Sequence, residues 1–294
     1  MNKTVTIGLP LPQLSEYATD VSWECRKSLD EMKKFSATQG ITTWEKSERS
    51  VNVAMNHVAC ANNMKGEWLL IVGSDHTFAP QALLLLLEAA YGLEGSEGYK
   101  EEDIPEEPVR KIIGAITPFR SHPYRWVAVK FDKYKNRLFP IVPYVDFHPG
   151  EAMGGSVIEV DAVGSGVCLY HRSVFETVPF PWFYFATRKR SLIGPDFRLC
   201  LDAADLGIKT YLHFGVTSLH WTFAPVTHVH YINYLRSDPV AWYSDANKGN
   251  PPTEDTIQEL KKYEHDQIKQ GTEELETEYA RENQGPEKEG DATI

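Results

Sequence analysis

The chain has 294 residues, of which 42% are hydrophobic and 24% are charged, and its formal net charge is −11. This composition is ordinary for a soluble globular protein, and no apolar run approaches the roughly 18 residues that a membrane-spanning helix needs, which excludes a helical membrane protein. The length is that of two domains or of one α/β domain with appendages, and the first residues show no long apolar stretch of a secretory signal.

The first half of the chain alternates strand and helix signals. In order, the predicted elements are a strand at Thr4–Leu9 that Pro10 and Pro12 end, a helix from Ser15 to about Phe35, a strand at Ile41–Trp44, a helix at Glu48–Met64, an apolar strand at Trp68–Val72 and a helix at Gln81–Tyr91. This order predicts a βαβαβ unit with a parallel sheet.

The second half predicts a sheet that becomes mixed. Its predicted elements are a strand at Lys111–Ile116, an antiparallel pair at Trp126–Phe131 and Arg137–Val145, strands at Val157–Val163 and Val167–Tyr170, a basic loop at Arg188–Arg190, a helix at Phe197–Leu206 and a strand at Thr210–Phe214 that leads to His220. Hairpin-like pairs among parallel strands are typical of mixed α/β sheets.

The cysteine and charge patterns indicate which kinds of site the chain can contain. The four cysteines (Cys25, Cys60, Cys168 and Cys200) form no Cys-x-x-Cys pair, which favours buried free thiols over disulfides or a zinc site. Residues 110–137 carry eight basic residues and one acidic residue, whereas residues 254–294 carry thirteen acidic and five basic residues. The basic stretch is either a face that attracts a polyanion or diphosphate, or an ordinary solvated hairpin.

Polar residues follow the apolar strand Trp68–Val72 without a break, in the sequence Gly73-Ser74-Asp75-His76. Open α/β sheets bind their ligands at the carboxyl ends of strands, so this turn is a candidate site. A second candidate turn is Gly164–Gly166, where glycines let the backbone approach a ligand.

Five motifs in order resemble a GT-A-fold glycosyltransferase, close to the family 2-like enzymes of phages and bacteria. They are GSDH, VDAVGSGVCLYHRSVF, PWF, GPDFRLCLDAADLGIK and SLHW, and the resemblance spans about Thr4–Trp221. It implies an α/β, Rossmann-like, mixed but mostly parallel sheet flanked by helices. It also implies a nucleotide-sugar donor, usually a UDP-sugar, held with Mn²⁺ or Mg²⁺ by an Asp-x-Asp motif.

The metal motif departs from the family, because Gly73 stands where the first acid is expected. The resemblance implies Asp75 as a metal ligand, with His76 and His220 completing the set, since imidazole is an acceptable ligand for Mn²⁺. The alternatives are a helix-capping role for Asp75, a satisfied turn histidine at position 76 and a buried structural histidine at position 220.

Asp196 stands where the family has its catalytic acid, and Pro195 replaces the neighbouring Glu. The resemblance implies that Asp196 is the general base of an inverting transfer, taking the proton of the acceptor hydroxyl. The alternative is that Asp196 stabilises the N-terminus of the helix that follows.

The remaining site residues are implied by the resemblance. Donor-binding residues are Pro10, Arg49, Asn52, Ser74, Asp75, Gly164, Ser165 and Gly166, and the sugar or acceptor platforms are Trp182 and Trp221. Core packing is the alternative for both tryptophans.

Three segments are expected: a glycosyltransferase domain at 1–221, an aromatic segment at 222–252 that packs on it, and an acidic helix with a disordered tail at 253–294 that could mediate a homodimer. The expected function is metal-dependent, inverting sugar transfer to a modified DNA base, a protein or a glycan, in the cytoplasm of a bacterial or phage-infected cell. An inert GT-A module that binds a nucleotide or glycan is the alternative.

Overall fold

A computed structural model gives the structure of the chain. It describes residues 4–11, 21–49, 55–56, 58–59, 63–94, 104–119, 125–132, 137–140, 156–188, 191–221 and 225–226. All of these belong to the first of the two units into which the chain divides, residues 1–232. The predicted segments at 222–252 and 253–294, apart from 225–226, lie outside the described residues.

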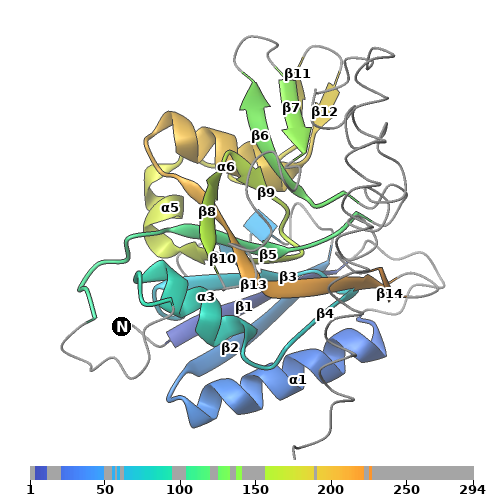
Figure 1. Ribbon diagram of the computed structural model, residues 1–294, viewed down its shortest axis with the longest axis vertical. Coiled ribbons are helices and arrows are strands. Elements are labelled where there is room, and N and C mark those ends of the chain that lie inside the picture. The colour runs from blue at the N-terminus through green and yellow to red at the C-terminus, as the bar shows by residue number, and fades with distance from the viewer. Residues whose placement is uncertain are drawn as a thin grey trace, which may run out of the picture. The chain divides into compact units, whose positions relative to one another are not determined.

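A nine-stranded sheet forms the centre of this unit, and its main path runs in the order β14-β13-β5-β10-β3-β1-β2, with β4 and β8 also paired to β13 (Figure 1). Its strands are β1 (Thr4–Leu11), β2 (Thr42–Arg49), β3 (Trp68–Val72), β4 (His76–Phe78), β5 (Ile112–Ile116), β8 (Val157–Val160), β10 (Val167–His171), β13 (Thr210–Trp221) and β14 (Pro225–Val226).

The central strands are mostly parallel. β1 pairs in parallel with both β2 and β3, and β13 pairs in parallel with β5. β10 lies between β3 and β5 and is antiparallel to both, so β3 and β5 point in the same direction. The predicted fold class, a mixed and mostly parallel sheet flanked by helices, is confirmed.

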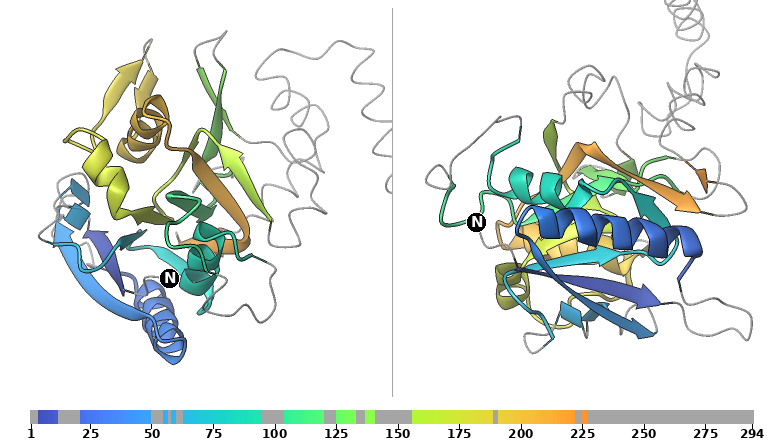
Figure 2. Two further views of the ribbon diagram at one scale, coloured as in Figure 1. Left: turned by 90° about the vertical axis from the view of Figure 1, so that its left-hand side faces the viewer. Right: turned by 90° about the horizontal axis from the view of Figure 1, so that it is seen from below.

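Helices cover both faces of the sheet. They are α1 (Trp23–Thr38), α3 (Ala82–Ala90), α5 (Arg172–Thr177) and α6 (Pro195–Asp205). Alternate residues of β1 and β3, such as Ile7 and Leu70, are fully buried in one core with Leu29 of α1 and Leu86 of α3. Figure 2 shows α1 on one side of the central strands and α5 and α6 on the other. Strands covered on both faces read as continuous apolar runs, as β3 does.

Two smaller sheets adjoin the central one. A three-stranded sheet has the order β7-β6-β9, and a two-stranded sheet pairs β11 with β12. Their strands are β6 (Ala128–Asp132), β7 (Arg137–Pro140), β9 (Ala162–Val163), β11 (Ala186–Arg188) and β12 (Ser191–Ile193). β6, β7, β11 and β12 lie at the top of Figure 1, and β9 lies beside α6. The antiparallel pair predicted near Trp126 and Arg137 is confirmed where it is described.

Several predicted boundaries are wrong. Helix α1 begins at Trp23, because the Ser22 side chain accepts the backbone N–H of Cys25 and caps the helix there, while the predicted cap, Ser15, lies outside the described residues. β2 runs on to Arg49, which pairs with Leu11, so Arg49 ends a strand and does not begin a helix. Exposed charged residues suit an edge strand of this kind.

Other elements were missed or misjudged. The strand predicted at 157–163 is broken at Asp161, since β8 pairs with β13 and β9 pairs with β6. The basic loop predicted at 188–190 is flanked by paired strands, β11 and β12. The short helix α5 was not predicted. The strand predicted to end at Phe214 continues to Trp221.

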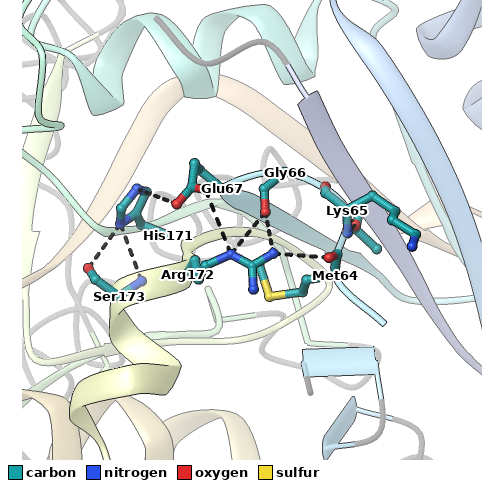
Figure 3. A network of polar contacts seen from close by, with 8 residues as sticks. Met64, Lys65, Gly66, Glu67, His171, Arg172 and Ser173 are labelled. Atoms are coloured by element: carbon teal, nitrogen blue, oxygen red, sulfur yellow. Dashed lines mark hydrogen bonds and ion pairs between the residues drawn. The ribbon is translucent and has the colours of Figure 1, made fainter. Parts of the chain in front are cut away.

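A polar network joins the start of β3 to the start of α5 (Figure 3). The guanidinium of Arg172 donates to the carbonyls of Met64 and Gly66, at 3.0 and 2.6 Å from Nη2, and forms an ion pair with Glu67. Gly66 has a φ of +80°, and a Cβ there would lie 2.3 Å from the carbonyl oxygen of Thr4. Arg172 therefore holds a turn that a side chain at position 66 would disrupt.

Two further predictions concern cysteines and membranes. Cys25, Cys168 and Cys200 are buried and free, as predicted, and burial raises the pKa of the Cys25 thiol to about 11; Cys60 lies outside the described residues. Among the described residues, every helix is too short or too polar to span a bilayer.

Candidate active site

The turn after β3 forms the base of the candidate site. The backbone N–H of Gly73 donates to the carbonyl of Gly166 at 2.8 Å, and the N–H of His76 donates to the carbonyl of Gly73 at 3.1 Å. The Ser74 carbonyl accepts the N–H of Ser22, the N-cap of α1, at 3.0 Å. The turn is therefore tied to α1 and to the turn before β10, which holds Asp75 at the carboxyl end of a buried strand.

A bend in β13 brings a distant histidine to this turn. β13 pairs with β5 from Thr210 to His213 and again at Thr217, and its register shifts between these two stretches. The Gly215 N–H donates to the Nδ1 of His213 at 2.9 Å inside this irregular stretch. Beyond it, β13 pairs with β4, and His220 stands directly opposite His76. A bulge redirects a strand in this way and re-aims the side chains that follow.

Asp75, His76 and His220 offer one ligand atom each, and these atoms all lie within 4.8 Å of one another. The Nε2 of His220 is 3.4 Å from Oδ2 of Asp75, and the Nε2 of His76 is 3.6 Å from Oδ1. The two rings stack with centroids 4.2 Å apart. We call these three residues the Asp–His–His cluster.

Each imidazole is oriented by a hydrogen bond on its other nitrogen. The Nδ1 of His220 lies 2.9 Å from the carbonyl oxygen of Pro118, which can only accept, so Nδ1 carries the proton. The Nδ1 of His76 lies 2.8 Å from the hydroxyl of Ser218. Partners of this type fix the tautomer and ring orientation of metal-binding histidines.

Burial keeps His76 neutral. The residue is 4% exposed, and desolvation, together with the nearby His220, lowers its pKa to about 3. In neutral His220, with the proton on Nδ1, the Nε2 lone pair faces the Asp75 carboxylate. Two acceptors that face each other are stabilised by a cation or a proton between them.

The cluster has a spacing close to that which a single divalent cation needs. Two atoms that each lie about 2.1 Å from one ion are at most about 4.2 Å apart. The two nitrogen–oxygen separations, 3.4 Å to Oδ2 and 3.6 Å to Oδ1 of Asp75, are within this limit, and all three ligand atoms lie within 4.8 Å of one another. The donor set of two imidazoles and one carboxylate is one that transition dications accept.

Asp196 lies at the start of α6 and is the second candidate group. Its Oδ2 accepts the N–H of Ser165 at 3.1 Å, and its Oδ1 accepts the N–H of Phe197 at 2.9 Å. Burial raises the pKa of the Asp196 carboxyl, and these two N–H donors oppose that rise. A carboxylate with a raised pKa is a better proton acceptor near neutral pH.

The Asp–His–His cluster and Asp196 adjoin the two ends of one turn, Gly164–Gly166. A Cβ at Gly164 would lie 3.5 Å from Oδ2 of Asp196, and a Cβ at Gly166 would lie 2.7 Å from Cε1 of His76. Two residues of backbone span at most about 7 Å. The two candidate groups, 120 positions apart from His76 to Asp196 in the sequence, are therefore neighbours in space.

Other predicted donor and acceptor residues are placed differently. Trp221 adjoins the cluster, because its backbone N–H donates to the Asp75 carbonyl and its Nε1–H donates to Thr77. Pro10 is buried near the end of β1. Asn52 and the side chain of Arg49 lie outside the described residues.

Trp182 belongs to a different environment. Its ring packs against Phe175 and Phe180, and its Nε1–H donates to the carbonyl of Val178 at 2.8 Å. Asn56 accepts the backbone N–H groups of residues 182 and 183. These are the contacts of an aromatic residue that packs against its neighbours.

Sequence reasoning assigned no role to Ser218, Pro118 or Thr117. Ser218 was detectable, because residues two apart on a strand share a face and His220 is two positions further on. The Pro118 carbonyl and the Thr117 hydroxyl gave no signal. Thr117 is 3% exposed, its hydroxyl has no hydrogen-bond partner in the described part of the chain, and its Cγ2 would contact a side chain at Gly166.

The basic residue that opens the stretch at 110–137, Arg110, lies away from the Asp–His–His cluster. Arg110 forms an ion pair with Glu94 at 2.7 Å and lies over the ring of Tyr211, before the amino end of β5. The Asp–His–His cluster lies beyond the carboxyl end of β5, beside Pro118. Arg110 and the cluster are thus at opposite ends of the same strand.

Comparisons with known proteins give distant structural similarities only. No protein-family model matches the chain, and no curated protein matches it. Similar solved structures include A197 from STIV, with 15% identity, a TM-score of 0.40 and coverage of 75% of this chain and 86% of that chain. GalNAc-T7 with UDP, GalNAc and Mn²⁺ has 12% identity and a TM-score of 0.42, covering 90% of this chain and 54% of that chain.

The inositol-1-phosphate CTP transferase from T. maritima has 10% identity, a TM-score of 0.39 and coverage of 85% and 98%. Similarities at this distance assign neither a family nor an activity to the chain.

Proposed function

We propose that the protein is a metal-dependent glycosyltransferase that moves a sugar from a nucleotide-sugar donor, a UDP-sugar, to an acceptor hydroxyl with inversion at the anomeric carbon. One observation carries this proposal. The Asp–His–His cluster and the Asp196 carboxylate adjoin opposite ends of the Gly164–Gly166 turn. Sugar transfer needs such a pair, with a cation site for the diphosphate and a base for the acceptor.

The cluster supplies the donor side of the site. Asp75, His76 and His220 would hold a divalent ion, which when bound neutralises charge on the diphosphate leaving group. The tautomer of His220, set by the Pro118 carbonyl, leaves its Nε2 lone pair directed at the Asp75 carboxylate. Because burial keeps His76 neutral, its ring adds no positive charge that would oppose cation binding.

Asp196 supplies the acceptor side. The acceptor oxygen bonds to the anomeric carbon while the bond from that carbon to the diphosphate oxygen breaks, and its electron pair leaves with the diphosphate. Asp196 takes the proton of the acceptor hydroxyl, a contribution of about 10²–10⁴-fold in rate for a general base. The backbone N–H groups of Ser165 and Phe197 hold the carboxylate in place for this transfer.

Release of UDP from UDP-sugars, measured with Mn²⁺ and with a chelator, tests the proposal. We expect Mn²⁺-dependent release in the wild type, and loss of at least about 10²-fold in rate in Asp196→Asn and Asp75→Ala. Asp205→Asn is the matched control, since Asp205 is an exposed acid at the other end of α6. Turnover that survives in Asp196→Asn would refute the role of this residue as the base.

A second candidate is an inert module of the same fold that binds a nucleotide or glycan. Gly73 and Pro195 favour it, because both stand where the resemblance expects an acid. Such a module would bind UDP in titration calorimetry but release none from any UDP-sugar. A wild-type protein that binds UDP and Mn²⁺ without turnover across a panel of UDP-sugars would support this candidate over the enzyme.

The salt dependence of acceptor binding distinguishes the possible classes of acceptor. A DNA acceptor would bind through phosphate contacts that weaken steeply as salt rises, because counterions are recaptured. A glycan or protein hydroxyl would bind with little salt dependence. Acceptor binding that is insensitive to salt would therefore exclude modified DNA as the acceptor.

A further inference from the structure

The ring of His76 occupies the space that a side chain at position 73 would need. A Cβ on Gly73 would lie 2.4 Å from Cδ2 of His76 and 3.1 Å from its Nε2. On another side of the ring, a Cβ on Gly166 would lie 2.7 Å from Cε1 and 3.0 Å from Nε2. The described glycines with positive φ are at other positions, so space for the ring explains these two glycines.

The ring is also held from its remaining sides. Its Nδ1 lies 2.8 Å from the hydroxyl of Ser218, which is 1% exposed, and its face stacks on His220 at an interplanar angle of 29°. These contacts direct Nε2 toward Asp75. An imidazole that is fixed in this way is prepared to bind an ion without reorganisation.

The missing first acid of the Asp-x-Asp motif is thus explained by a replacement. A Cβ at position 73 would also lie 3.4 Å from Oδ1 of Asp75, so an acid there would stand beside the Asp75 carboxylate, in space that the ring of His76 now fills. An acid at 73 and the ring at 76 exclude each other. The described site therefore contains one carboxylate and two imidazole nitrogens where two carboxylates were expected.

We propose that this replacement sets the metal selectivity: the Asp–His–His cluster binds Mn²⁺, Co²⁺ or Zn²⁺ and discriminates against Mg²⁺ and Ca²⁺. Imidazole suits transition dications, whereas Mg²⁺ and Ca²⁺ require oxygen ligands and carboxylate charge. The cluster has one negative charge, and His76 is buried among protein atoms. The cluster should therefore bind weakly an ion that keeps its water shell. This inference concerns the same site as the proposed function, but it does not require catalysis.

Calorimetric titration of the full chain with each chloride salt, with no nucleotide or acceptor present, measures the selectivity directly. We expect Mn²⁺ to bind at least about tenfold more tightly than Mg²⁺, and Co²⁺ and Zn²⁺ more tightly than Mn²⁺. His76→Ala should lower Mn²⁺ affinity by at least about tenfold and change Mg²⁺ affinity little. Ser218→Ala, which removes only the partner of Nδ1, should lower Mn²⁺ affinity by about 10–100-fold.

The double variant Gly73→Asp/His76→Ala is the sharpest test. It exchanges the nitrogen for a carboxylate in the same space, so the ratio of Mn²⁺ to Mg²⁺ affinity should fall at least about tenfold below that of the wild type. His76→Ala alone is its control, because that variant removes the nitrogen without supplying an oxygen. If the double variant fails to fold, broadening of the His76 and His220 ring signals by Mn²⁺ in NMR spectra of the wild type reports the same ligands.

Equal wild-type affinity for Mg²⁺ and Mn²⁺, or unchanged Mn²⁺ affinity in His76→Ala, would overturn the inference. Failure of the proposed function is distinguishable from either outcome. A protein that selects Mn²⁺ but transfers no sugar supports the inference and refutes the enzyme. A protein that transfers sugar equally well with Mg²⁺ supports the enzyme and refutes the inference.

Discussion

Gly166→Ala probes how tightly the structure surrounds His76. The new methyl group would lie 2.7 Å from Cε1 and 3.0 Å from Nε2 of His76, and 2.9 Å from Cγ2 of Thr117. The ring has little room to move, because Gly73 adjoins its opposite side and Ser218 holds its Nδ1. Something must shift by a few tenths of an ångström, and we expect the imidazole to move away from Asp75.

Overpacking of this kind costs about 1–3 kcal/mol of unfolding free energy. For a domain of about this size, 1 kcal/mol corresponds to about 2–4 °C in Tm, so a 2 kcal/mol loss would lower Tm by about 4–8 °C. Urea denaturation and thermal unfolding measure the loss. Calorimetric titration with Mn²⁺ measures the second consequence, a fall in affinity of at least about tenfold as the ligand nitrogen is displaced.

Gly114→Ala is the matched control. Gly114 lies in β5, and the three atoms nearest its new methyl group would all belong to Val163 and not to the cluster, the Cβ at 2.9 Å, so stability should fall comparably while Mn²⁺ affinity is retained. In a His76→Ala background, Gly166→Ala should cost at least about 1 kcal/mol less, because the main clash is gone. Unchanged Mn²⁺ affinity in Gly166→Ala, or an equal loss of Mn²⁺ affinity in Gly114→Ala, would refute a specific displacement of His76.

Three further predictions concern groups outside the proposed ligands. Burial lowers the pKa of His213 to about 4, below the ordinary value of about 6.5, and Nδ1 must be unprotonated to accept the Gly215 N–H. As pH falls from about 6.5 to 4, His213 is protonated in the unfolded chain but not in the folded chain, so the free energy of unfolding of the wild type should fall by about 3 kcal/mol. His213→Asn should not show this loss. Parallel curves of unfolding free energy against pH for the two proteins would contradict the prediction. Thr117→Val replaces a buried hydroxyl without a described partner by a methyl group, and we expect a gain of about 1 kcal/mol in urea denaturation; a loss would show that the hydroxyl has a partner. Arg172→Lys removes the forked donors to Met64 and Gly66 and should lower the free energy of unfolding by about 1–3 kcal/mol. Arg198, which forms a partly exposed ion pair with Asp202, is the control, and Arg198→Lys should lower it by less than about 1 kcal/mol. Similar losses in both variants would contradict the role of the network in Figure 3.

The parts of the site that the sequence indicated are those with local signals. The apolar run Trp68–Val72 followed by Gly73–His76 predicted a buried strand with polar groups at its carboxyl end, and β3 is that strand. Pro195 and Asp196 predicted the start of a helix, and α6 begins at Pro195. Each of these signals depends on residues adjacent in the chain, so the sequence shows it without knowledge of which distant strand pairs there.

The parts that the sequence did not indicate depend on pairing between distant strands. β4 is only three residues long and has no periodic sequence signal of its own. It forms a strand because β13 continues past the end of β5 and pairs with β4. The same pairing places Ser218 against His76, 142 positions away. Arg49 was misassigned to a helix for a related reason, since only its pairing with β1 makes that segment a strand.

By itself, the sequence determined most of the strand and helix order around the central sheet and indicated the candidate acids Asp75 and Asp196, because apolar runs, proline and glycine act on the residues next to them in the chain. Only the tertiary structure decided that the Asp–His–His cluster and Asp196 adjoin one turn and that the ring of His76 fills the space beside Gly73. The physical reason is that side chains from several strands occupy the same small region of the site, so the space left at one position depends on residues far away in the sequence. A glycine that appears as a missing acid in the sequence is therefore understood only when the side chain that occupies its space is known.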